Sequence, residues 1–240
     1  MTALRLADAG EAVDLAAFLA RLIHYDRAAA VRLQARDGVL AVFGRPPSFE
    51  VLAIRTARLA DDTTLDVTVS AGELLEGVRE SADTVTVPAA VTGPPWAGVL
   101  PPRGGWRRVP GLPAPDALLR AVAAAVAEFR ARDEALPPPH RTRAERDRIG
   151  REIWSRTLGD THLPLRAVHA AQSLGFLRAA RTGALAGSGT PPGTGQAPQP
   201  PTLLEAGGWL RLSTAYGSIA VRTGGPAGLK GLSGLTVTPM

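Results

Sequence analysis

The stretch VRLQARDGVLAVFG, residues 31–44, indicates a β-hairpin and sets the fold class for the first part of the chain. Its two strand-like runs flank Asp37 and Gly38, a dipeptide that favours the two positive φ angles of a type I′ turn. Three further runs have the composition of strands: residues 49–59, 65–69 and 84–87. Hairpins pair their strands in opposite directions, so we expect an antiparallel sheet.

Three capping boxes predict helix starts before and after this hairpin. In each box an N-cap side chain accepts a hydrogen bond from the first turn, and a glutamate follows three residues later. The pairs are Asp8 with Glu11, Ser70 with Glu73, and Thr142 with Glu145. The first box opens a helix over residues 9–23, where apolar residues recur at helical spacing. The simplest assembly of residues 1–90 is therefore an N-terminal α+β domain with helices on one face of the sheet.

The chain after residue 90 predicts a different organisation. Residues 91–115 form a long loop, because they are rich in proline and glycine and carry two tryptophans. A helical region follows over residues 116–181, with an N-cap at Asp116 and a last helix from Leu163 to about Ala180.

The last part of the chain is predicted to return to β structure. Residues 182–202 have the composition of a flexible linker, and residues 203–240 form a C-terminal β-hairpin and tail, with a last short strand at 235–238. A lone hairpin is not stable in water, so this one either packs on the helices or extends the first sheet. The predicted class is α+β: an antiparallel sheet with helices on one face, a helical region and a returning C-terminal β-hairpin.

The charge of the chain is distributed unevenly. The first 100 residues contain 9 arginines and 13 acidic residues, whereas the remainder contains 17 arginines, one lysine and 9 acidic residues. The high arginine content by itself is also what a GC-rich genome produces. The asymmetry remains, and it indicates that the second half contacts an acidic partner or docks onto the acidic half.

Arginines cluster on and before one predicted helix of the second half. With the next helix they could form a helix-turn-helix that binds nucleic acid, and two further arginines beside Trp106 could meet a nucleic-acid strand. The alternative is a solvated, salt-bridged helix, because Glu145, Asp147 and Glu152 stand at helix-neighbour spacing from the arginines. The candidate residues for binding nucleic acid or an acidic partner are Arg107, Arg108, Arg141, Arg143, Arg148, Arg151 and Arg166.

Trp96 and Trp106 lie among prolines, glycines and arginines in the long loop. Tryptophan and arginine are typical of protein interfaces, so these two residues are candidate anchors of a homo-oligomeric structural protein. The alternative is that both tryptophans hold the loop onto its own domain.

The motifs of several enzyme classes are missing. The chain has no cysteine, no phosphate-binding loop and no nucleophile elbow. We therefore expect no catalytic residue, metal site or cofactor. The alternative is an enzyme with a site between the sheet and the helices, and its candidate residues are Asp160, His162, His169 and Tyr216. No signal peptide or membrane-spanning run is evident, so we expect a cytoplasmic protein without a membrane partner.

Three segments carry a family resemblance: PPRGGW at residues 101–106, LPLRAVHAAQSLGFL at 163–177 and WLRLSTAYGSIAVR at 209–222. They resemble a family of conserved actinobacterial proteins without an assigned function. The resemblance implies a bacterial, cytoplasmic setting and no particular activity. Taken together, the observations favour a non-enzymatic binding or regulatory protein whose arginine-rich second half contacts an acidic protein or nucleic acid.

Overall fold

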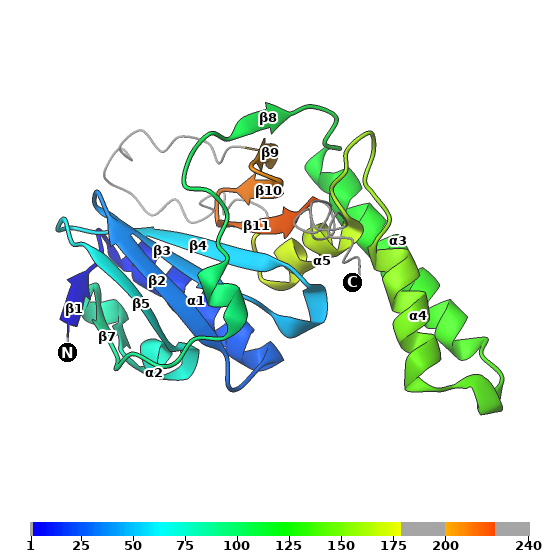
Figure 1. The fold of residues 1–240 in the computed structure, drawn as a ribbon, viewed down its shortest axis with the longest axis horizontal. Coiled ribbons are helices and arrows are strands. Elements are labelled where there is room, and N and C mark those ends of the chain that lie inside the picture. Colours follow the sequence, from blue (N-terminus) through cyan, green and yellow to red (C-terminus); the bar gives the residue numbers. More distant parts are fainter. Residues whose placement is uncertain (1, 179–199, 224–240) are drawn as a thin grey trace, which may run out of the picture.

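The structure is a computed structural model that describes residues 2–178 and 200–223 (Figure 1). Its central element is an eight-stranded antiparallel sheet in the order β5-β2-β3-β4-β11-β10-β9-β8. The first four strands in this order come from the first part of the chain and the last four from the second. Their bounds are β2 Ala30–Arg36, β3 Val39–Gly44, β4 Leu52–Arg58, β5 Leu65–Ser70, β8 Arg107–Val109, β9 Thr202–Ala206, β10 Trp209–Thr214 and β11 Gly217–Arg222. The predicted α+β class is confirmed.

The two halves of this sheet meet where β11 pairs with β4. The pairs are Ser218 with Ile54, Ile219 with Ala53, and Ala220 with Leu52. The C-terminal hairpin thus extends the first sheet, which was one of the two expected arrangements. The predicted hairpin of β2 and β3 is also present, with positive φ angles of 51° at Asp37 and 71° at Gly38.

A second, three-stranded sheet lies beside the first, in the order β1-β7-β6. It contains the predicted strand β7, Thr84–Val87, between β1, Thr2–Arg5, and β6, Val78–Arg79. The sequence pattern did not indicate β1 or β6, because both are too short to show a period. The prediction of a strand at residues 84–87 is therefore confirmed, but this strand belongs to a separate sheet.

Helices α1, Ala9–Tyr25, and α5, Leu165–Ser173, cover one face of the large sheet, which we call the inner face. The short helix α2, Ala71–Glu76, packs beside α1. The predicted caps are present, since Asp8 Oδ1 accepts a hydrogen bond from Glu11 N at 3.1 Å, and Ser70 and Thr142 make the corresponding bonds. The apolar side of α1 is buried against the sheet, and that burial is the main stabilising term for the helix.

Helices α3, Pro115–Glu134, and α4, Arg143–Trp154, form a helical hairpin that projects away from the sheet (Figure 1). We call this pair the helical arm. The predicted N-cap at Asp116 is wrong, because α3 begins at Pro115, its N-cap is Ala114, and Asp116 lies in the first turn. Proline is suited to the first helical position, where its φ angle fits and no backbone N–H is required.

Helix α5 ends at Ser173, earlier than the predicted end near Ala180. The reason is Gly175, which has a φ of 75° and ends the helix in a left-handed turn. The N–H of Phe176 donates to the Ala171 carbonyl at 2.7 Å, the bond that defines this type of helix end. The predicted linker at 182–202 lies outside the described residues except for its last three, and the strand at 235–238 lies wholly outside them.

Candidate functional site

Three of the four predicted arginines of the helical arm are bonded within the arm. Arg148 Nε lies 2.9 Å from Glu145 Oε2, and Arg143 Nε lies 3.8 Å from Asp147 Oδ2. Arg141 donates to the carbonyl oxygens of Leu136 and Glu134, at 2.9 and 3.1 Å, and so satisfies the C-terminal end of α3. In the described part of the chain, Arg151 is exposed and makes no ion pair.

A denser network joins α3 to α4. Arg132 lies 2.7 Å from Glu152 and 3.4 Å from Glu128, and Arg156 contacts the same two carboxylates. The hydrogen bonds from Arg132 lower the pKa of Glu152 to about 2, so this carboxylate stays charged well into acid. Residues 115–156 contain nine arginines and seven acidic residues. Most of the positive charge of the arm is therefore compensated locally.

Arg166 and Arg107 lie on two other elements, the helix α5 and the strand β8. Arg166 is half-buried on α5, and its Nε has no hydrogen-bond partner in the described residues. Most of α5 is buried against the inner face, so the helix is not available to enter a groove of DNA. Arg107, on β8, is exposed and lies 3.3 Å from Glu205. The geometry thus gives no support to the helix-turn-helix arrangement.

A group of arginines that make no ion pair in the described residues lies on the outer face of the sheet, opposite α1 and α5. The register aligns Arg108 with Leu204 and Leu204 with Arg211, so both arginines point to the same face. Trp209 stands opposite Arg222 on the neighbouring strand, again on this face. We call the group the basic–aromatic patch, and its members are Trp106, Arg108, Trp209, Arg211 and Arg222.

Guanidinium groups and indole rings stack within this patch. The Cζ of Arg211 lies 5.6 Å from the centre of the Trp106 ring, and that of Arg222 lies 5.4 Å from the Trp209 ring. Arg211 Nε also donates to Ser218 Oγ at 2.8 Å. Burial lowers the pKa of Arg211, because its charge is partly removed from water without a carboxylate beside it. Contacts within the patch therefore orient Arg211 and Arg222.

No carboxylate neutralises the patch in the described structure. Within residues 2–178 and 200–223, Arg108, Arg211 and Arg222 make no ion pair. The remaining residues of the chain contain no aspartate or glutamate at all. Residues 101–114 and 200–223 carry five arginines and one acid, Glu205, which is paired with Arg107. This region of the surface is therefore suited to a negatively charged group.

Trp96 and Trp106, the predicted interface residues, both pack on the outer face of their own sheet. They contact a cluster of apolar residues that covers the β3, β4, β10 and β11 strands: Phe43, Leu52, Ile54, Trp209 and Ala220. Trp106 Nε1 also donates to the Pro102 carbonyl at 3.1 Å. Both indole rings remain half-buried. The tryptophans therefore hold the loop of residues 91–106 on the sheet. Figure 1 shows the course of this loop across the sheet.

The four candidate residues of an enzyme site are not brought together. His169 stacks on Trp154 at 4.3 Å and meets Phe49 at 5.1 Å, and burial lowers its pKa. Tyr216 lies instead in the β10–β11 turn, under the guanidinium of Arg178 at 3.9 Å. Asp160 and His162 are exposed in the connection between α4 and α5. The geometry offers no shared site for these side chains.

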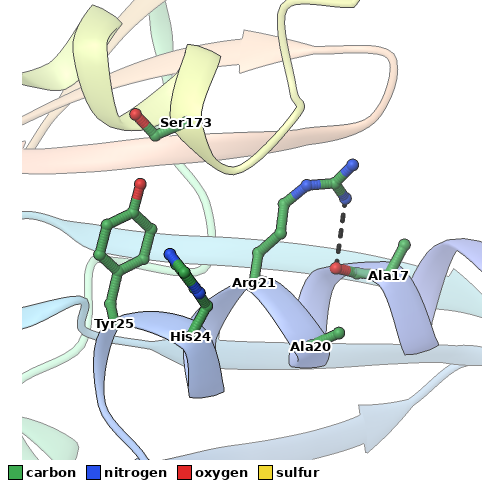
Figure 2. Close-up of a pocket in the computed structure, with 6 residues that line it drawn as sticks. All are labelled: Ala17, Ala20, Arg21, His24, Tyr25 and Ser173. Atoms are coloured by element: carbon green, nitrogen blue, oxygen red, sulfur yellow. Dashed lines mark hydrogen bonds between the residues drawn. The ribbon is translucent and has the colours of Figure 1, made fainter.

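The described residues line two hollows of several hundred Å³. One lies between α1 and α5 and has a volume of about 360 Å³ (Figure 2). The other, of about 670 Å³, lies beside Trp96 and Arg45 at the edge of the outer face. Among residues 2–178 and 200–223, no three histidine or acidic side chains are grouped as metal ligands. None of the helices in those ranges is long and apolar enough to cross a membrane.

Sequence reasoning missed Trp209, Arg211 and Arg222, although a signal for them was present. Trp209 and Arg211 are two residues apart in a predicted strand, so they share one face. Arg222 ends the partner strand of the same hairpin. The sequence does not show whether this face of the hairpin is covered or exposed. Only the packing of α5 in the structure shows which side of the hairpin is inner.

Two family models match consecutive parts of the chain. The first, described as Domain of unknown function (DUF8010), matches residues 1–98, and the second, described as Domain of unknown function (DUF8185), matches residues 101–226, more than half of the chain. No curated protein and no solved structure matches. The findings agree with the resemblance to a family without an assigned function. The two matches meet inside the loop of residues 91–115, yet both parts contribute strands to one sheet.

Proposed function

We propose that this chain, which belongs to the family described as Domain of unknown function (DUF8185), is a binding protein that holds an acidic partner on the outer face of its sheet. The observation that carries the proposal is the basic–aromatic patch. Its three arginines lie on one face without a carboxylate to neutralise them, although the chain as a whole carries 22 acidic residues.

The chemistry of the patch fits phosphate or carboxylate groups. A guanidinium that stacks on an indole ring keeps its N–H groups at the edge, where they can donate in pairs to two oxygens of one anion. Stacking also limits the movement of the long side chains, so less conformational entropy is lost on binding. Because the rings are already partly covered, we expect contacts to the charged groups of the partner and little stacking of bases on the tryptophans.

The test compares the patch with the helical arm. A fluorescently labelled single-stranded oligonucleotide and labelled poly-glutamate are titrated with the protein over a series of salt concentrations. The R108Q/R222Q variant removes two patch charges, and the R143Q/R151Q variant removes two arm charges. We expect the patch variant to bind with an affinity lower by roughly tenfold or more. The slope of log affinity against log salt should also become shallower by about 2, because binding releases about one counterion fewer for each anion contact that is lost.

The arm variant is the matched control, since it changes the net charge by the same amount on exposed arginines. We expect it to bind both probes nearly as well as the unchanged protein. The relative affinities for the two probes separate a nucleic acid from an acidic protein as partner. Equal losses in both variants would mean that binding depends only on net charge, and binding of neither probe would remove the proposal.

A further inference from the structure

The hollow between α1 and α5 is a second place where a positive charge lacks a partner. Figure 2 shows the side chains of Arg21, His24 and Tyr25 rising from α1 toward α5, with Ser173 above them at the end of α5. Ala17 and Ala20 form an apolar floor because their short side chains leave space. A volume of about 360 Å³ is within the range of small-molecule sites in proteins.

Arg21 makes no ion pair with a carboxylate of residues 2–178 and 200–223. Its Nη1 donates to the Ala17 carbonyl at 3.2 Å, within its own helix. The acidic residues of α1 and its N-cap are already bonded to other arginines of the described chain, in the following pairs: Asp8 with Arg58, Glu11 with Arg55 and Arg58, and Asp14 with Arg55 and Arg178. The half-buried charge of Arg21 is therefore uncompensated in residues 2–178 and 200–223.

The turn after α5 lies directly against this guanidinium. A Cβ atom at Gly175 would lie 2.9 Å from the Cζ of Arg21, closer than side-chain atoms pack. Gly175 also has the φ of 75° that ends α5, a conformation that disfavours other residues. The same glycine thus ends the helix and leaves room for Arg21 at the rim of the hollow.

Residues with a hydroxyl group line the same space from both helices. The Tyr25 ring is held edge-on against Phe49, with centres 5.2 Å apart, and against His24 at 5.5 Å, so its hydroxyl has a fixed direction. Ser173 lines the hollow from α5, and its hydroxyl can turn about the Cα–Cβ bond. Both hydroxyls can donate a hydrogen bond to an oxygen anion. One cation and two hydroxyl donors above an apolar floor form a site for an anion with a small apolar body.

We infer that the hollow between α1 and α5 binds a small organic anion, whose carboxylate or phosphate group meets Arg21, Tyr25 and Ser173 and whose apolar part lies over Ala17 and Ala20. The site is on the inner side of the sheet. It is separate from the basic–aromatic patch and does not depend on the proposed binding of an acidic partner.

The test uses benzoate and phenyl phosphate as probes and benzyl alcohol as the uncharged counterpart, with binding measured by isothermal titration calorimetry on the full chain. We expect saturable binding of at least one of the two anions and at least roughly tenfold weaker binding of benzyl alcohol. R21Q should weaken binding of that anion roughly tenfold or more, because a charge-assisted bond is lost. Tighter benzoate indicates a carboxylate ligand, and tighter phenyl phosphate indicates a phosphate ester.

Two further variants keep the test independent of folding. Y25F removes only a hydroxyl and should weaken binding several-fold with an unchanged melting temperature. R27Q, which changes an exposed arginine just after α1, should leave binding unchanged, as should R108Q/R222Q in the patch. The inference is overturned if neither anion saturates, if R21Q binds as tightly as the unchanged protein, or if benzyl alcohol binds as well as the anions.

Discussion

The helical arm and the basic–aromatic patch present arginine in two different settings. In the arm, Arg132 and Arg156 each have two carboxylates within 4 Å. In the patch, Arg211 and Arg222 have indole rings beside them and no carboxylate in the described structure. The arm has nine arginines and also seven acidic residues, whereas the three arginines of the patch have no carboxylate beside them in the described residues. The number of basic residues in a segment therefore says little about which arginines lack an acidic partner.

The difference follows from the geometry of the two kinds of element. On a helix, residues three or four apart are neighbours, so a sequence that alternates glutamate and arginine compensates its own charge. Glu128 with Arg132 and Glu145 with Arg148 are examples. On a strand, the neighbours on one face are two apart and come from other strands. Arg211 therefore has Leu204 and Ala220 beside it, which cannot compensate its charge.

The largest expected effect on the free energy of unfolding concerns Arg55, an arginine that is both ion-paired and buried. Arg55 is only 8% exposed, lies 3.2 Å from Glu11 and from Asp14, and donates to the Tyr216 carbonyl at 2.9 Å. Arg55→Ala should lower the free energy of unfolding by about 3–5 kcal/mol, because two carboxylates lose their buried partner. Urea denaturation measures the loss. Arg58→Ala, at an exposed partner of Glu11, should cost much less; equal losses would contradict the role of burial.

A smaller effect of opposite sign is expected in the patch. Arg211→Met removes a half-buried charge that has no carboxylate partner in the described residues. The methionine side chain has a volume similar to that of the arginine it replaces. We expect the free energy of unfolding to stay equal or to rise by up to about 1 kcal/mol, while affinity for the anionic probe falls. Thermal melting and the probe titration measure the two quantities. Arg151→Met in the arm should change neither, and a large loss of stability in Arg211→Met would show that the arginine is structural.

The smallest expected effect is a pH dependence of the free energy of unfolding that comes from Glu152 in the arm. The pKa of Glu152 is about 2 in the folded protein, below its ordinary value of 4.5. The carboxylate therefore stabilises the folded state above pH 4.5, and this contribution is lost as the pH falls toward 2. Urea denaturation of the unchanged protein and of Glu152→Gln should give curves that converge over this range. A constant difference between the two would contradict the assigned pKa.

Much of the fold was predictable because its signals are local. Asp37 with Gly38 determines the β2–β3 turn, and Asp8 determines the start of α1. Short elements without a period, such as β8 and β9, could not be predicted. The end of α5 at Ser173, just before the left-handed turn at Gly175, was missed because apolar residues continue beyond it in the sequence.

The candidate sites were less predictable than the fold. The interleaved acids of the arm correctly suggested a salt-bridged helix, since these contacts depend on spacing within one element. Arg211 could be placed on a strand face, but whether that face is covered depends on helices and loops far away in the sequence. Arg21 gave no sequence signal, because its lack of a partner results from the pairing of Asp14 with Arg55 and Arg178.

The pairing of β4 with β11 has a consequence for how the protein is made. Residues 52–54 leave the ribosome long before residues 218–220, which complete the sheet beside them. Until then β4 exposes a row of unsatisfied backbone groups, a template on which another nascent chain can add a strand. Slow translation between the two segments should therefore favour aggregation. A fragment that stops near residue 98 should need a chaperone, or a supplied second fragment, to remain dispersed.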